Sequence, residues 1–83
     1  MITSHQMRAA RALLGIDQRQ LAELAGLSVP TIQRMEASEG SVRAVVDSLE
    51  KVVRAFDEAG VELIGPGARS VGEGRGVRLI ARS

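Results

Sequence analysis

The sequence predicts a mainly α-helical protein, with a domain of four helices followed by a short pair of β-strands near the carboxyl end. Apolar residues recur at helical spacing through about the first 60 residues, and residues that favour helix ends stand at the boundaries of these segments. After Gly60 the pattern changes to a period of two, which is typical of a strand. We therefore expect a helical domain over residues 1–60 and a glycine-rich tail over residues 61–83.

The first helix is expected to begin after Thr3 and to end near Gly15. Thr3 and Gln6 have the spacing of a capping box, in which two side chains satisfy each other's free backbone N–H groups. The residues expected on the buried face of this helix share helical spacing and are Met7, Ala10, Leu13 and Leu14.

A second, short helix is predicted from Gln18 to the residue before Gly26. Asp17 is a favourable N-cap, and Gln20 stands three residues later as its capping-box partner. Gly26 can adopt the left-handed backbone conformation that commonly ends a helix. The helix should therefore be about two turns long.

A third helix is predicted directly after this glycine. Ser28 is its expected N-cap, and Pro30 falls in its first turn, where the missing N–H costs little. Because the restart is abrupt, the two helices should cross steeply, with Ala22, Ile32 and Met35 filling the angle between them. Such a pair of helices can set one helix across a DNA backbone and place the next in the major groove.

The segment LLGIDQRQLAELAGLSVPTIQRMEAS resembles the helix-turn-helix of the Xre/Cro-type bacterial and phage repressors. The residues that fall in register with this motif are Gln18, Leu21, Ala22, Gly26, Ser28, Ile32 and Glu36. The resemblance extends over roughly the first 60 residues. It implies a compact, lambda-repressor-like helical domain that binds DNA and usually acts as a dimer on a two-fold operator.

The resemblance also implies an ion pair between Arg11, near the centre of the first helix, and Glu36, which ends the third. This pair would brace one helix against the other. The alternative is a solvated arginine, since exposed ion pairs are common and weak. Val29 and Pro30 depart from the family pattern, because they replace polar residues that are often found at the start of the third helix.

Candidate DNA-binding residues lie on and around the third helix. The candidates for reading bases are Val29, Pro30, Thr31, Gln33 and Arg34. Arginine can bind guanine through two donors, glutamine can pair with adenine, and methyl groups can pack on thymine. The candidates for binding phosphate are Gln18, Arg19, Ser28 and Arg43. For each of these, an ordinary solvated surface residue is the alternative.

A fourth helix is expected from Val42 to about Ala59, with Gly60 ending it, after a loop formed by residues 39–41. The apolar residues at helical spacing in this segment are Val42, Val45, Val46, Leu49, Val52, Val53 and Phe56. Since valine lowers intrinsic helicity, burial of this face against the first three helices must compensate.

In the tail, residues 61–64 and 77–80 are predicted to be short strands, joined by a glycine-rich connector. Two lone strands are marginal in water, so something must cover them. The same strands of a second subunit would do so, and the dimer-interface candidates are Leu63, Ile64, Leu79 and Ile80. Pairing of the tail with its own helical domain is the alternative.

Composition excludes several other classes of function. The chain has no cysteine, and its single histidine, His5, has no evident catalytic or metal-binding partner, so neither an enzyme nor a cofactor is expected. The glycines between residues 72 and 76 precede a predicted strand, whereas a nucleotide-binding loop needs a helix there. No apolar run approaches the roughly 20 residues that span a bilayer, and no signal-peptide pattern is present, so we expect a cytoplasmic protein.

The net charge of +1 is weak evidence for nucleic acid, so any basic surface must arise from the sorting of charges onto faces. We expect a transcriptional regulator, most simply a repressor, that binds a double-stranded DNA operator as a homodimer. The alternative is an antitoxin-type or other protein-interaction module whose tail folds on a toxin or another protein partner.

Overall fold

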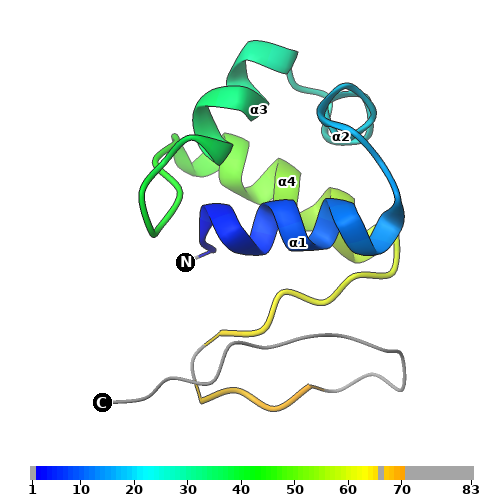
Figure 1. Ribbon diagram of the computed structural model, residues 1–83, viewed down its shortest axis with the longest axis vertical. Coiled ribbons are helices and arrows are strands. Elements are labelled where there is room, and N and C mark those ends of the chain that lie inside the picture. The colour runs from blue at the N-terminus through cyan, green and yellow to red at the C-terminus, as the bar shows by residue number, and fades with distance from the viewer. Residues whose placement is uncertain (1, 66, 71–83) are drawn as a thin grey trace.

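The computed structural model describes residues 2–65 and 67–70, and this part of the chain contains four α-helices (Figure 1). They are α1 (Ser4–Leu14), α2 (Gln18–Ala25), α3 (Val29–Glu36) and α4 (Val46–Glu58). Helix α2 packs against both α3 and α4, and α3 also contacts α1. The prediction of a mainly helical, four-helix domain is confirmed.

The predicted capping boxes set the starts of α1 and α2. At α1 the Thr3 hydroxyl accepts the Gln6 backbone N–H at 3.1 Å, and the Gln6 side-chain oxygen accepts the Thr3 N–H at 2.9 Å. Asp17 and Gln20 make the same reciprocal pair at 2.8 and 2.9 Å. These bonds satisfy backbone donors that have no partner within the helix, which explains why the sequence located both starts correctly.

The turn between α2 and α3 is tight because of Gly26, whose φ is +68°. The Gly26 N–H bonds to the Glu23 carbonyl at 3.3 Å, and the Leu27 N–H bonds to the Ala22 carbonyl at 3.0 Å. This is the hydrogen-bond pattern that closes a helix through a left-handed residue. Ser28 then caps α3, since its hydroxyl accepts the Thr31 N–H at 3.2 Å.

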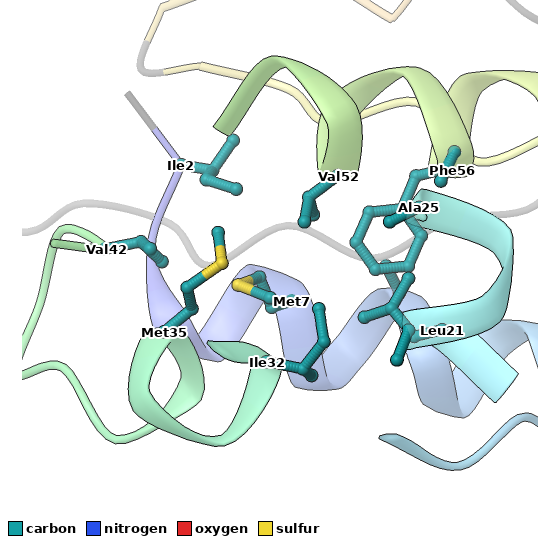
Figure 2. Close-up of a cluster of buried hydrophobic side chains, with 12 residues drawn as sticks. Ile2, Met7, Leu21, Ala25, Ile32, Met35, Val42, Val52 and Phe56 are labelled. Atoms are coloured by element: carbon teal, nitrogen blue, oxygen red, sulfur yellow. The ribbon is translucent and has the colours of Figure 1, made fainter. Parts of the chain in front are cut away.

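The core lies where the four helices meet (Figure 2). Phe56, the single aromatic residue of the chain, is fully buried and faces Leu21, while Met7 and Met35 point toward one another. The residues predicted to fill the angle between α2 and α3 are all buried: Ala22, Ile32 and Met35. Helices α2 and α3 are therefore held by the same core as the rest of the domain.

One residue predicted for the buried face of α1 lies outside the core. Leu13 is 50% exposed, whereas Met7 and Ala10 are buried and Leu14 packs against the core. A helix turns by about 100° per residue, so Leu14 returns to within about 20° of Met7 while Leu13 lies about 120° away. The prediction that Leu13 lies on the buried face of α1 was wrong, because it relied on the apolar character of the residue alone.

The start of the fourth helix was also predicted wrongly, because α4 begins at Val46 and not at Val42. Val42 is buried, but its backbone N–H donates to the Ile2 carbonyl at 2.9 Å, and the Ser4 N–H donates to the Gly40 carbonyl at 3.0 Å. Residues 40–42 thus pair with the chain that leads into α1. This pairing prevents a helix from starting there. Three valines that were predicted for the buried face of this helix are exposed: Val45 and Val46 at about 70% and Val53 at 40%.

The predicted strand over residues 61–64 is not present, and the structure has no β-strand among residues 2–65 and 67–70. The Val61 N–H instead closes the end of α4 on the Phe56 carbonyl at 2.8 Å. Val61 and Leu63 pack against the core, and the Gln6 side-chain amide donates to the Ile64 carbonyl at 2.9 Å. The alternation therefore reflects contact with the helical domain. The second predicted strand, with Leu79 and Ile80, lies outside the described residues.

Candidate nucleic-acid interface

Helix α3 has one buried face and one exposed face. Ile32, Met35 and Glu36 are buried, and at helical spacing the opposite direction is occupied by Pro30 and Arg34, both exposed. Of the other base-reading candidates, Gln33 is exposed, Thr31 is half-buried, and Val29 is half-buried and packs against the core. The structure thus brings Pro30, Thr31, Gln33 and Arg34 to the solvent side of α3, with Val29 at its edge.

Polar side chains along this exposed face are linked to one another. The Ser28 and Thr31 hydroxyl oxygens lie 2.9 Å apart, and Arg34 donates from Nη2 to the Thr31 hydroxyl oxygen at 3.3 Å. The three residues follow an i, i+3, i+6 order, so their side chains form one line along the helix. This line runs from the N-cap to the last turn of α3.

The residues predicted to bind phosphate differ in their surroundings. Gln18 is half-buried, and its side-chain amide already donates to Glu36 Oε1 at 3.2 Å. Arg19 is largely exposed, with its Nε 3.9 Å from a Glu23 carboxylate oxygen, which is a long and weak ion pair. Arg43 is exposed on the loop after α3, where its backbone N–H donates to the Ser38 hydroxyl at 3.0 Å.

A buried ion pair fixes the position of α3 on α1. Arg11 donates from Nε to Glu36 Oε2 at 2.6 Å and from Nη2 to Oε1 at 2.8 Å, which is a two-point contact between guanidinium and carboxylate. The Glu36 side chain is only 3% exposed. The hydrogen bond to Glu36 raises the pKa of Arg11 above its ordinary value. The predicted brace is confirmed, and the alternative of a solvated Arg11 is wrong.

Two further contacts to Glu36 were not predicted from the sequence. Arg8 donates from Nη1 to the Glu36 backbone carbonyl at 2.7 Å, and Gln18 donates to its carboxylate as described above. Arg8 thereby satisfies a carbonyl at the end of α3 that has no partner within the helix. The sequence did hold a signal for Arg8, since it stands three residues before Arg11 and therefore on the same side of α1.

Within the described residues, no helix has both the length and the apolar character needed to cross a membrane. Nor do these residues include a group of histidine, aspartate and glutamate side chains that could hold a metal ion.

Comparison with protein families identifies the class of this chain. A family model described as Helix-turn-helix matches residues 7–63, which is more than half of the sequence. The chain therefore belongs to the Xre/lambda-repressor-like helix-turn-helix family, a family of DNA-binding regulators. The match includes all four helices except the first turn of α1. No curated protein and no solved structure matches the chain.

Proposed function

We propose that the protein is a sequence-specific regulator of transcription that binds double-stranded DNA as a homodimer and acts as a repressor. The observation that carries this proposal is the exposed face of α3, on which Pro30, Gln33 and Arg34 face solvent while the opposite face is buried. The buried pair of Arg11 and Glu36 supports it, because it holds that face in one orientation.

In the proposed complex α3 lies in the major groove. Arg34 binds guanine through two donors, Gln33 pairs with adenine, and the apolar atoms of Pro30 and Thr31 pack on thymine methyl groups. Val29 reaches only the edge of this contact, because it also packs against the core.

Phosphate contacts fix the register of the protein on the duplex. Two of the candidates for these contacts lie close to α3 in the sequence: Ser28 at its start and Arg43 on the loop that follows it. Gln18 stands at the start of α2, where free backbone N–H groups favour an anion. Its amide carries two hydrogens, so it can donate to a phosphate while keeping its bond to Glu36. Arg19 adds charge at the same end of α2.

The dimer follows from the two-fold symmetry that paired half-sites require. The described part of the tail lies at the opposite end of the molecule from α3, so a subunit contact there leaves the reading face free (Figure 1). We assign residues 1–60 to DNA binding and residues 61–83 to dimerisation. The candidate contacts are Leu63, Ile64, Leu79 and Ile80, of which Leu63 also packs against the core of its own subunit. A dimer that covers its operator excludes other proteins from the same DNA, which is the simplest route to repression.

Selection of bound sequences from random duplexes tests the proposal with the purified full chain. The expected result is a two-fold symmetric motif whose half-sites are centred about 10–10.5 base pairs apart. Arg34→Ala is the matched variant, and it should flatten the preference at one position of each half-site. Binding without any sequence preference, or a motif with no symmetry, would contradict the proposal.

A further inference from the structure

We propose that Thr31 determines specificity by positioning the Arg34 guanidinium on the reading face, and this inference rests on the proposed DNA-reading function. The side chain of Thr31 is the acceptor for Arg34 Nη2 at 3.3 Å. Thr31 therefore acts through Arg34, and its hydroxyl is not itself the group that reads a base.

The acceptor is well placed for this role because it is anchored. Thr31 is half-buried, and its backbone N–H and its hydroxyl both bond to the Ser28 hydroxyl, at 3.2 and 2.9 Å. Thr31 is also β-branched, so few rotamers of its side chain are available in a helix. Arg34 is exposed and has a long, flexible side chain, so a fixed acceptor three residues earlier restricts where its guanidinium lies.

The bond to Thr31 leaves Arg34 enough hydrogen-bond donors to bind a base. A guanidinium has five N–H donors, and the bond to Thr31 uses one of them. The remaining four still include two adjacent donors, which is what a two-point contact with guanine needs. The positioned Arg34 therefore favours guanine at one base pair, set by where Thr31 holds it.

The two hydroxyl groups provide a second consequence. Ser28 and Thr31 carry two hydroxyl hydrogens, and their mutual bond uses one of them whichever residue donates. The bonds from the Thr31 N–H and from Arg34 use none. When Thr31 is the donor, the hydrogen left over belongs to Ser28, whose hydroxyl is already a phosphate candidate of the proposed function, and Thr31 makes no hydroxyl contact of its own with DNA.

A double-mutant cycle on the selected duplex tests the positioning role. Thr31→Val removes the hydroxyl and keeps the side-chain shape, and Thr31→Ser, which keeps the hydroxyl, is the matched control. Thr31→Val should weaken binding by about 3- to 10-fold and reduce the preference for guanine at the position that Arg34→Ala also affects. Thr31→Ser keeps the hydroxyl and should therefore retain the preference for guanine at that position, whatever it loses at a thymine contact through the missing methyl group. In the Arg34→Ala background, Thr31→Val should have no further effect.

Additive losses in this cycle would overturn the inference, because they would show that Thr31 contacts DNA on its own. A parent protein that binds every duplex equally would instead refute the proposed function. The two failures are therefore distinct.

A measurement on the free parent protein keeps the inference testable even if Thr31→Val does not fold. Relaxation of the side-chain Nε nuclei reports how far each arginine moves on the ps–ns timescale. Arg34 should be more ordered than Arg43, which is exposed on the loop after α3. Equal disorder of these two side chains would overturn the positioning role.

Discussion

Removing Arg11 from its pair with Glu36 should strongly destabilise the domain. The Glu36 side chain is 3% exposed and that of Arg11 is 19% exposed, so the pair lies largely out of water. Arg11→Met keeps most of the side-chain volume but leaves the Glu36 carboxylate with Gln18 as its remaining side-chain donor. Breaking one half of a buried pair costs about 3–5 kcal/mol, and the residual Gln18 bond places the expected loss at the lower end, about 3 kcal/mol.

That loss is large beside the total stability of such a domain. A chain of 83 residues is expected to unfold with about 4–12 kcal/mol. A loss of about 3 kcal/mol should lower the midpoint of thermal unfolding by roughly 12–24 °C, at about 4–8 °C for each kcal/mol. Thermal and urea unfolding, followed by circular dichroism, measure both quantities.

Two companion variants separate the missing partner from lost packing. Glu36→Gln removes the buried charge and retains an acceptor for Arg11, so its cost should be smaller, about 1–2 kcal/mol. Arg11→Met combined with Glu36→Met replaces the pair by apolar side chains and should recover most of the stability lost in Arg11→Met alone. The reasoning is refuted if Arg11→Met changes the unfolding free energy by less than about 0.5 kcal/mol.

The pKa of Arg11 fixes the pH dependence expected of this contribution. Because the folded state raises that pKa, the stabilisation from Arg11 is fully present below the ordinary pKa of an arginine and is lost only at still higher pH. Arg11 therefore stays protonated in both the folded and the unfolded state between roughly pH 6 and pH 9. Its titration should add no pH dependence over this range to the difference in unfolding free energy between the parent and the double methionine variant.

Three further outcomes follow from the structure. Gly26→Ala should destabilise the domain by about 1 kcal/mol or more, because the backbone φ of Gly26 is +68°. The control is Gly65→Ala, at a glycine without a positive φ, which should change the unfolding free energy by less than about 0.5 kcal/mol. Arg34→Ala should weaken binding of the selected duplex by about 1–3 kcal/mol and relax the preference at one base position. Arg43→Ala should weaken binding of all duplexes alike and reduce the slope of log binding constant against log salt concentration by about one. Fluorescence titrations measure both effects. Truncation after Ser70 retains the core contacts of Val61 and Leu63 but should convert the dimer into a monomer in sedimentation experiments. A truncated protein that still sediments as a dimer would exclude residues 71–83 as an essential dimer contact.

The sequence was sufficient for the features that depend on neighbouring residues. The starts of the first three helices were predicted correctly because Thr3, Asp17 and Ser28 each bond to a backbone N–H three residues later. The turn at Gly26 was predicted for the same reason, since a left-handed residue closes the helix locally.

Features that depend on distant parts of the chain were not predicted. Val42 follows the helical apolar pattern, but its backbone is paired with Ile2, forty residues earlier, and this contact decides the start of α4. Residues 61–64 alternate like a strand, yet the nearest partner for the Ile64 carbonyl is the side chain of Gln6. An apolar pattern identifies most of the residues that reach the core, although Leu13, Val45 and Val46 stay exposed, and it does not identify which backbone groups are free to form a helix or a strand.

The contacts of Glu36 explain how so small a domain can hold α3, the proposed reading helix, in a fixed position. Its carboxylate and carbonyl together accept hydrogen bonds from Arg8 and Arg11 of α1 and from Gln18 of α2. An apolar contact tolerates some sliding of one helix on another, whereas a buried carboxylate left without its donors is costly. We infer that this cluster selects one arrangement of the three helices. If α3 binds DNA as proposed, its face is already ordered in the free protein, so that less of the free energy of binding is lost in ordering the protein.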